Sequence, residues 1–272
     1  MAVKLIAVDM DGTFLNDRME YNYDRFYKLF LKMKEHGIRF VVASGNQYYQ
    51  LKSFFGGLQE EISYVAENGA FVVDQGEDLF SIDIPKNHVR MILEELLAHK
   101  HLSVVLCGKE SAYVHESVSD DFFTTMNKFY HRLKRVENFE DVNDQILKFA
   151  LLCSESETTQ LLDTLRDRIG GIITPVSSGY GSIDLIVPGI HKAYGIQLLQ
   201  KKWNIQDEET MAFGDSGNDI EMLKHVQYGI AMENASPEVK EIAKYTAPSN
   251  NDEGVLEIIE QYFEREGPFK DQ

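Results

Sequence analysis

The chain opens with a run that is apolar apart from Lys4, residues 3–8 (VKLIAV), and two acidic residues, Asp9 and Asp11, follow it. The run is rich in β-branched residues and no cleavage-like site follows it, so we expect a buried strand and not a signal peptide. A strand that is apolar on both faces is typical of a parallel sheet covered by helices. Ligand sites in such sheets lie at the carboxyl ends of strands, which is where the two carboxylates fall.

Apolar strands alternate with segments of helical periodicity at both ends of the chain, which predicts a parallel α/β sheet. Residues 23–36 carry apolar side chains at helical spacing and precede Gly37, a typical helix end. A strand over 38–44, a helix over 47–55, a strand over 63–66 and a hairpin over 71–84 are expected next. After residue 188 we expect helices over 192–203, 219–225, 237–245 and 254–265, and strands over 210–214 and 228–232.

The middle of the chain has a different order of elements, αββαβαββ, with a proline at each edge, Pro85 and Pro188. The expected elements are helices over 85–100, 120–133 and 155–169, hairpins over 102–115 and 171–187, and a strand over 146–153 that Lys148 interrupts. We therefore predict an α/β core formed by residues 1–84 and 189–272. An inserted α+β domain over residues 85–188 would split this core, and its length is ordinary for a domain.

Acidic residues outnumber basic ones by 44 to 27, which gives a net charge of −17 at pH 7. Such a chain repels polyanions, so we expect neither nucleic acid nor an anionic membrane surface as a partner. No apolar run approaches the roughly 18 residues of a spanning helix. The two cysteines, Cys107 and Cys153, have no metal-like spacing. We expect a cytoplasmic protein with reduced thiols, and the sequence indicates no obligate protein partner.

The aspartates after the first strand are the first candidates for chemistry. Two carboxylates two residues apart at a strand end can divide the roles of nucleophile and general acid/base between Asp9 and Asp11. Gly12 lets the chain turn away, and Thr13 can donate a hydrogen bond. The alternative is a solvated turn after a strand, because short motifs of this kind also arise without function.

Two further groups suit an anionic ligand. Ser44, Gly45 and Asn46 follow the second strand, where a hydroxyl and free amides at a helix start can hold phosphate oxygens. Their alternative is an ordinary helix cap. Lys192 begins a helix, a position where a cation opposes the helix dipole, so it is a better functional candidate than most surface lysines.

Residues 214–219 (GDSGND) form the fourth group, again after a strand. Asp215, Asn218 and Asp219 crowd a glycine-rich turn, and their oxygens suit a hard cation such as Mg²⁺. The alternative is a turn that caps the next helix. All four groups fall at strand exits or helix starts of one expected sheet. Together the four groups supply metal ligands, a nucleophile, phosphate-binding amides and a lysine, which are the groups that phosphoryl transfer requires.

These residues resemble the four ordered motifs of the haloacid dehalogenase superfamily. The motifs are Asp9-Met10-Asp11-Gly12-Thr13, Ser44-Gly45-Asn46, Lys192 and Gly214-Asp215-Ser216-Gly217-Asn218-Asp219. The insert resembles the type-2 cap of the Cof-type phosphatases, and stretches such as FVVASGNQYYQL and GDSGNDIEMLK are similar to bacterial sugar phosphatases of that group. The resemblance implies a Rossmann-like core with a cap that sets substrate specificity.

The resemblance also implies a mechanism. Asp9 attacks phosphorus to give an aspartyl-phosphate, and Asp11 first protonates the leaving oxygen and then activates water. Mg²⁺ is held by Asp9, Asp215 and the backbone carbonyl of Asp11. The second aspartate indicates a phosphatase or a phosphomutase, because dehalogenases of the superfamily lack it. The implied substrate is a small phosphorylated metabolite, in the first place a hexose or pentose phosphate.

The implied binding residues are Ser44, the amides near Gly45, Lys192 and Asn218, with Asp219 orienting Lys192. Many relatives have Arg where this chain has Asn46, which makes the site less positive and suits a sugar hydroxyl.

In the cap, Tyr180 between two glycines is a candidate for specificity, and Tyr113 and His115 are others. Three alternatives stay open. A phosphomutase would need a basic cluster in the cap. The cap offers scattered Lys86, Arg90, Lys109 and Lys128 and the run 132–135, which we interpret as a solvated helix end. A nucleotide or vitamin-precursor phosphatase and a non-catalytic binding protein are the other two.

Overall fold

The computed structural model describes residues 2–99, 102–179 and 181–270. The chain forms two compact units, one of Met1–Ser44 with Lys192–Gln272 and one of Gly45–His191. The second unit therefore contains the sequence-predicted insert together with some forty residues before it. The narrower boundaries of residues 85–188 stay a prediction for the part that acts as a cap.

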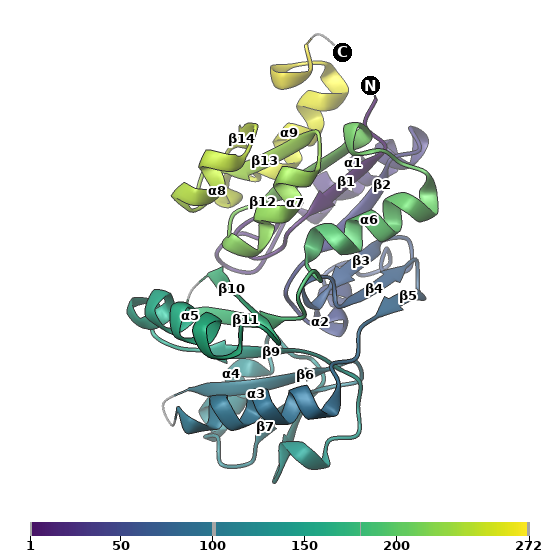
Figure 1. Ribbon diagram of the computed structural model, residues 1–272. Helices are drawn as coiled ribbons and strands as arrows, with labels where there is room; N and C mark the ends of the chain where they lie inside the picture. The colour runs from purple at the N-terminus through teal and green to yellow at the C-terminus, as the bar shows by residue number, and fades with distance from the viewer. Residues whose placement is uncertain (1, 100–101, 180, 271–272) are drawn as a thin grey trace. The chain divides into compact units, whose positions relative to one another are not determined.

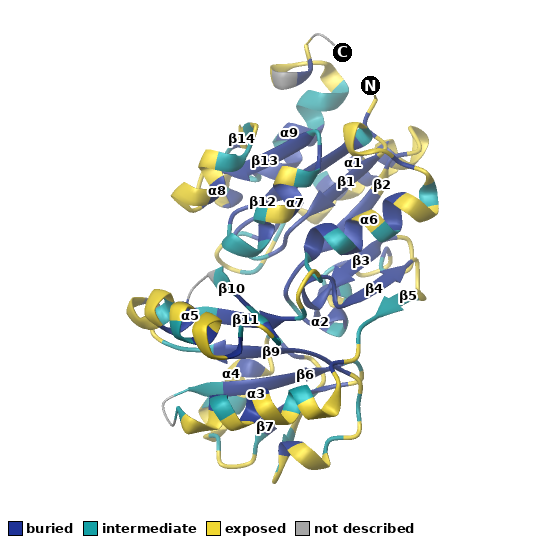
Figure 2. Ribbon diagram, viewed as in Figure 1, coloured by how far each residue is buried: buried dark blue, intermediate teal, exposed yellow. Residues whose placement is uncertain are grey.

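The first unit is built on parallel strands. Their order is β14 (Tyr245–Ala247), β13 (Tyr228–Met232), β12 (Thr210–Gly214), β1 (Leu5–Val8) and β2 (Arg39–Ala43). Val8 at the end of β1 lies beside Phe213 of β12 and Val42 of β2, so these three strands end level with one another. Every residue of β1, β12 and β13 is buried, as expected for strands covered on both faces. Figure 2 shows these strands in the colour of buried residues.

Helices of the first unit pack in pairs against this sheet. α1 (Tyr23–Glu35) contacts α9 (Gly254–Glu264), and α6 (Lys192–Trp203) contacts α7 (Ile220–His225). Figure 1 shows α6 and α7 in front of the strands. The amphipathic pattern explains the orientation of α1, which buries Phe26, Leu29, Phe30 and Met33 and is capped by the Asn22 side chain.

The second unit contains two sets of strands. β3 (Ser63–Ala66), β4 (Phe71–Asp74) and β5 (Glu77–Ser81) pair antiparallel, and α2 (Tyr48–Ser53) precedes them. A six-stranded sheet follows in the order β10 (Thr174–Gly179), β11 (Ser182–Ile186), β9 (Ile146–Leu152), β6 (Ser103–Gly108), β7 (Ala112–His115) and β8 (Leu133–Val136). All pairs in it are antiparallel except β7 with β8.

The two faces of the six-stranded sheet differ in their cover. α3 (Lys86–Ala98) and α5 (Glu155–Ile169) pack on one face over a large apolar cluster that includes Phe149, Leu151 and Leu185. The other face carries a smaller cluster with Val105, Cys107 and Ala150, against the short helix α4 (Asp120–Met126). Because side chains alternate along a strand, Lys148 and Asp184 fall on the α4 face.

Two sequence expectations are wrong at the level of single elements. The helix expected over 120–133 ends at Met126, and Leu133–Val136 is an edge strand, not a solvated helix end. Here the backbone pairs with β7, a non-local partner that periodicity does not reveal. The helix expected over 237–245 ends at Ile242, and Tyr245–Ala247 forms strand β14. Within the described residues, no helix combines the length and the apolar character needed to span a membrane.

Candidate active site

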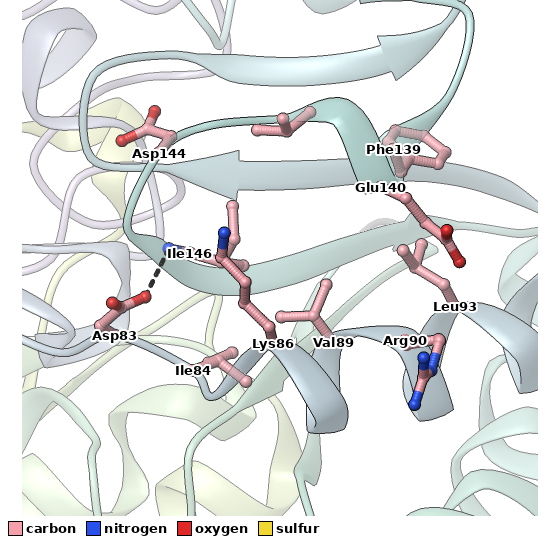
Figure 3. Close-up of a pocket in the computed structure, with 11 residues that line it drawn as sticks. Asp83, Ile84, Lys86, Val89, Arg90, Leu93, Phe139, Glu140, Asp144 and Ile146 are labelled. Atoms are coloured by element: carbon pink, nitrogen blue, oxygen red, sulfur yellow. Dashed lines mark hydrogen bonds between the residues drawn. The ribbon is translucent and has the colours of Figure 1, made fainter.

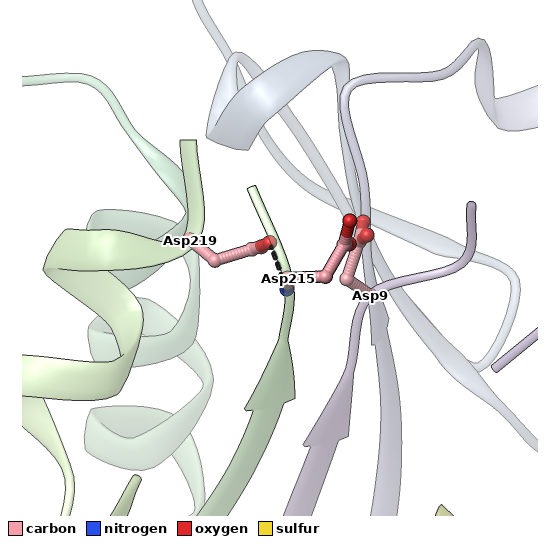
Figure 4. A group of neighbouring side chains, drawn as sticks. All are labelled: Asp9, Asp215 and Asp219. Atoms are coloured by element: carbon pink, nitrogen blue, oxygen red, sulfur yellow. Dashed lines mark hydrogen bonds between the residues drawn. The ribbon is translucent and has the colours of Figure 1, made fainter. Parts of the chain in front are cut away.

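The carboxyl ends of β1 and β12 bring Asp9 and Asp215 together. The amide of Asp9 donates to the carbonyl of Phe213 (3.1 Å), which extends the ladder between the two strands by one residue. Both carboxylates are buried, and Figure 4 shows them pointing the same way from neighbouring strand ends. The structure therefore joins two predicted site residues that lie 206 positions apart in the sequence.

A tight loop carries the chain from Asp9 past Asp215. The amides of Thr13 and Leu15 both donate to the carbonyl of Met10, at 3.2 and 2.9 Å. Gly12 has a φ of +72°, and a Cβ there would lie 2.7 Å from Oδ2 of Asp215, so any other residue would meet the carboxylate. The hydroxyl of Thr13 donates to Oδ1 of Asp215 (3.0 Å). Thr13 and Gly12 thus fix the position of Asp215.

Lys192 lies between two carboxylates. It is fully buried at the start of α6, and its Nζ donates to Oδ1 of Asp9 (2.6 Å) and to Oδ1 of Asp219 (2.7 Å). Helix α6 aims its first residue at the end of β1, and the two ion pairs offset the unfavourable position of a cation at a helix N-terminus. A buried lysine keeps its charge only with such partners.

Asp219 has the role of a scaffold. Its Oδ2 accepts hydrogen bonds from the amides of Asp215 and Ser216, both at 3.0 Å, while Oδ1 holds Lys192. Figure 4 shows the first of these bonds running from the carboxylate to the backbone of Asp215. Both oxygens are therefore engaged by N–H groups, and Asp219 links the turn after β12 to the buried lysine.

Burial and mutual repulsion raise the pKa values of the central carboxyls. The pKa of Asp9 is raised well above its usual value by burial, with Asp219 and Asp215 adding to the effect and Lys192 opposing it. Burial, and then Asp219, raise the pKa of Asp215 to about 6. Burial lowers the pKa of Lys192, but Asp219 and Asp9 more than reverse this, so the lysine stays charged. Three carboxyls against one ammonium leave a deficit of positive charge.

This donor set fits a divalent cation. Asp9, Asp215 and Asp219 each have a carboxylate oxygen within 4.8 Å of the others. Asp219 has both oxygens bound to N–H donors, so Asp9 and Asp215 are the better ligands, in agreement with the ligand set that the motifs imply. Oxygen ligands of this kind suit Mg²⁺, and a dication would supply the missing positive charge.

The remaining predicted residues fall in different places. Asp11, half-buried after β1, Ser44, buried after β2, and Asn218, half-buried in the turn after β12, belong to the first unit. Gly45 and Asn46 belong to the second unit, so the chain passes from one unit to the other within the second motif. The roles assigned to these five residues stay predictions. Tyr180 lies outside the described residues.

Sequence reasoning missed the side chains that hold the loop after Asp9. Nδ2 of Asn234 donates to the carbonyl of Gly12 (2.7 Å), and Nδ2 of Asn250 donates to the carbonyl of Leu15 (3.0 Å). The amide of Asn250 in turn donates to Oδ1 of Asn234 (3.1 Å). Asn234 lies in a turn and Asn250 begins a short 3₁₀ helix, Asn250–Asp252, and neither belongs to a motif. Only the tertiary structure brings them to the loop after Asp9. The hydroxyl of Ser216, inside the fourth motif, donates to Oδ2 of Asp215 (3.0 Å).

Tyr113 and His115, which we considered for specificity, have partners within the second unit. The hydroxyl of Tyr113 donates to Asp144 (2.9 Å), and the ring of His115 contacts the hydroxyl of Ser117 (2.7 Å).

Cys107 and Cys153 both have free thiols, in agreement with the expectation of reduced cysteines.

The basic residues considered for a second phosphate have separate surroundings in the described part of the chain. Lys109 pairs with Asp78 (2.9 Å), and Arg135 pairs with Asp120 (2.6 Å). Lys86 and Arg90 line a cavity of about 200 Å³ on the α3 face, shown in Figure 3. Its other charged lining residues are acidic, namely Asp83, Glu140 and Asp144. The arrangement that a phosphomutase would need for a second phosphate is therefore not favoured by these residues.

Comparison with known proteins agrees with the motifs. The sequence matches the haloacid dehalogenase-like hydrolases over residues 6–259. It is 49% identical, over 99% of both chains, to the 5-amino-6-(5-phospho-D-ribitylamino)uracil phosphatase YbjI of Escherichia coli (strain K12). The structure of SMU.1108c from Streptococcus mutans UA159 is similar with a TM-score of 0.93 and 36% identity, over 97% of this chain and 100% of the other.

The fold is also that of the HAD subclass IIB sugar phosphatase BT4131, with a TM-score of 0.81 and 22% identity over 96% of this chain and 99% of that one. The fold class and the family predicted from the four motifs are thus confirmed. The chain belongs to the haloacid dehalogenase-like hydrolases.

Proposed function

We propose that the protein is a Mg²⁺-dependent phosphatase that cleaves phosphate monoesters of small polyol-bearing metabolites through an aspartyl-phosphate. The observation that carries the proposal is the buried Asp9 carboxylate at the end of β1, with one oxygen held by Lys192 and Asp215 beside it. A carboxylate fixed in this way, in a site rich in charge, suits nucleophilic attack on phosphorus.

The reaction divides into two steps. Because Lys192 engages Oδ1 of Asp9, we assign the attack on phosphorus to Oδ2, which forms a new P–O bond as the ester P–O bond breaks. Asp11 gives a proton to the leaving alkoxide, so the first product departs as an alcohol. Asp11 then takes a proton from water, whose oxygen attacks phosphorus and releases Asp9 and inorganic phosphate. Lys192 stays charged throughout and stabilises the anionic phosphoryl group.

Asp9, Asp215 and the backbone carbonyl of Asp11 would hold Mg²⁺. When bound, the ion supplies positive charge to the phosphoryl oxygens and to the carboxylates that burial otherwise destabilises. Thr13 and Ser216 would keep Asp215 in the ligand position through their hydrogen bonds. Asp219 would keep Lys192 on Asp9.

The first candidate substrate is 5-amino-6-(5-phospho-D-ribitylamino)uracil. The support is the 49% identity to a phosphatase of that name over nearly the whole chain. This molecule is a phosphorylated polyol joined to a pyrimidine, so it combines the sugar-like part that the motifs suggest with the vitamin-precursor alternative. Hexose and pentose phosphates are the other candidate substrates, and they complete the panel of phosphate esters to be tested.

The test is hydrolysis of p-nitrophenyl phosphate and of this panel, with Mg²⁺ and with EDTA, by the wild type and Asp9→Asn. We expect metal-dependent activity that falls by at least about 10⁴-fold in the variant, because the nucleophile is lost. Rapid quench with a ³²P-labelled substrate should trap a phosphorylated enzyme in the wild type alone. Asp24→Asn, on the exposed side of α1, removes the same charge and should keep full activity.

Activity that persists in Asp9→Asn would show that another group attacks phosphorus. Transfer of the phosphoryl group to a second sugar hydroxyl without release of phosphate would favour a phosphomutase. Binding of phosphorylated ligands without turnover of any panel member would favour a binding protein.

A further inference from the structure

A second buried lysine lies between carboxylates in the second unit. Lys148 on β9 and Asp184 on β11 lie on the α4 face of the six-stranded sheet, and both are almost completely buried. Nζ of Lys148 donates to Oδ1 of Asp184 (2.5 Å). The apolar cluster on this face includes Cys107, the cross-strand neighbour of Lys148, and reaches Ala150 on β9. Lys148 and Asp184 are therefore polar residues beside an apolar cluster.

The carboxylate of Asp184 accepts hydrogen bonds from several donors. Besides Lys148, its Oδ2 accepts from Nδ2 of Asn68 and from the hydroxyl of Ser178, both at 2.6 Å. The backbone of Gly45 also approaches it, because a Cβ at Gly45 would lie only 2.9 Å from Oδ2 of Asp184. Asp184 is therefore a fixed centre that joins the sheet to the segment around Gly45 and Asn68.

Glu67 is different, although it belongs to the same cluster. The residue is 1% exposed, and neither Oε1 nor Oε2 has a hydrogen-bond partner within the described part of the chain. The nearest cation, Nζ of Lys148, lies 3.6 Å from Oε2. Buried polar atoms are normally hydrogen-bonded, and a buried carboxylate without such bonds is costly. Glu67 also has a φ of +51°, which is uncommon for this residue type and adds strain.

The cluster adjoins the motif expected to bind phosphate. The amide of Glu67 donates to the carbonyl of Asn46 (3.1 Å), and a Cβ at Gly45 would meet the side chains of Asp184 and Asn68, at 2.9 and 3.2 Å. A substrate whose phosphate is held by the amides near Gly45 would therefore place its organic part within reach of Glu67. The unmet acceptors of Glu67 would then find N–H or O–H donors on that part.

The charge of the cluster selects the kind of group that can bind. Glu67 and Asp184 supply two carboxyls against the single ammonium of Lys148, so a second phosphate would be repelled. Lys148 stays charged because Asp184, Cys107 and Glu67 raise its pKa against the effect of burial. The hydrogen-bonding groups that remain available are the acceptor oxygens of Glu67 and the other N–H groups of Lys148. These suit a ligand that carries hydroxyl or amino groups.

We propose that Glu67, supported by Lys148 and Asp184, recognises the uncharged, hydroxyl- or amino-bearing end of the substrate and disfavours substrates with a second phosphate. This inference rests on the function proposed above and names the substrate class for it. Glu67 contacts the ligand directly, whereas Asp184 positions Lys148.

The experiment compares the wild type with Glu67→Gln on a ribitol phosphate, on ribitylaminouracil phosphate and on p-nitrophenyl phosphate, which lacks donor groups. Glutamine preserves the shape but removes the charge and half of the acceptors. We expect kcat/KM for the two polyol esters to fall about 10- to 100-fold relative to p-nitrophenyl phosphate, mainly through KM. Ribitol 1,5-bisphosphate should gain relative to the monophosphate, because a repulsive charge is removed.

Direct binding separates this proposal from the proposed reaction. Calorimetry with phosphate-free ribitylaminouracil requires no catalysis, and we expect Glu67→Gln to weaken its binding at least tenfold. Glu94→Gln, on the exposed side of α3, is the matched control and should change neither binding nor rates. Lys148→Met is a second variant, for which the same substrate-selective loss is expected.

A parallel fall for all three esters would assign Glu67 to the structure and overturn the proposal, as would unchanged binding of the phosphate-free ligand. Absence of any phosphatase activity in the wild type would overturn the proposed function alone, because the binding measurement would still decide the role of Glu67.

Discussion

Each compact unit buries one lysine between two carboxyl groups, but the two arrangements differ in how completely they are satisfied. Lys192 hydrogen-bonds both of its partners, Asp9 and Asp219, at 2.6 and 2.7 Å. Lys148 hydrogen-bonds Asp184 and leaves Glu67 at 3.6 Å. We infer that Lys192 provides a fixed charge for the reaction, whereas the cluster of Lys148 and Glu67 keeps hydrogen-bonding groups available for a ligand.

The surroundings of the two lysines follow the same division. Asp219 is tied to two backbone amides, so Lys192 and Asp9 have little freedom to rearrange. Such preorganisation is what electrostatic catalysis requires, because no free energy is then spent on reorienting the charges during the reaction. Glu67 lacks comparable bonds within the described residues, so a ligand can supply them.

Removing each lysine in turn gives the largest expected contrast. Lys192→Met should lower kcat for p-nitrophenyl phosphate by roughly 10²- to 10³-fold, because the attacking carboxylate and the phosphoryl group lose their fixed cation. Lys148→Met should reduce that rate far less. Both variants should lose about 3–5 kcal/mol of stability, since each leaves buried carboxylates without their partner. Steady-state rates with urea unfolding test both statements, and equal losses of activity would end the comparison.

From the sequence, a functional role could be predicted for Lys192 but not for Lys148. Lys192 and the carboxylates near it follow strand ends, and parallel strands bring their carboxyl ends to one edge, so order along the chain was enough to group them. Lys148 was visible only as an interruption of an apolar strand. Charged residues are almost never fully buried unless paired, so Lys148 in ILKFALL and Asp184 in SIDLIV could have been matched as partners. Nothing in the sequence marks Glu67 as their neighbour.

The elements that sequence reasoning missed share a non-local cause. Strand β8 contains Leu133 and Val136, whose spacing of three among charged residues imitates a helix face. What makes it a strand is pairing with β7, from Ala112 opposite Leu133 to His115 opposite Val136. By contrast, β1 and β12 are continuous apolar runs whose burial on both faces is evident locally. The core was therefore predictable in outline, whereas edge strands depend on contacts that only the fold provides.

The pH dependence of stability should distinguish the cluster of Glu67, Lys148 and Asp184 from the cluster around Lys192. Burial raises the pKa of Glu67 to about 7, with Lys148 opposing and Asp184 reinforcing the shift, whereas an unfolded glutamate titrates near 4.5. The folded state thus holds this proton more tightly, so its contribution to stability is complete below about pH 4.5 and is lost as the pH rises to about 7.

Urea unfolding at pH 5 and pH 8 measures this loss. Relative to Glu67→Gln, the wild type should lose about 2.5 kcal/mol of unfolding free energy between the two pH values. The variant removes only this titration, so effects of all other groups cancel in the difference. A difference that does not change with pH would mean that Glu67 is ionised and satisfied in the folded protein.

The smallest contrast concerns the hydroxyls that hold one carboxylate in each unit. Thr13 donates to Oδ1 of Asp215 (3.0 Å), and Ser178 donates to Oδ2 of Asp184 (2.6 Å). Thr13→Val and Ser178→Ala should each cost about 1–2 kcal/mol of stability, the usual loss for a hydrogen bond to a charged group.

The functional effects of Thr13→Val and Ser178→Ala should differ. Without its hydroxyl partner, Asp215 holds Mg²⁺ less firmly, so Thr13→Val should raise the Mg²⁺ concentration needed for half-maximal activity several-fold. Ser178→Ala should leave that concentration unchanged and shift only the KM for polyol esters, because Asp184 positions Lys148. Mg²⁺ titrations at saturating substrate separate the two, and Thr13→Ser, which keeps the hydroxyl, should restore the wild-type requirement. If Ser178→Ala changed the metal requirement as much as Thr13→Val does, the two clusters could not be functionally independent.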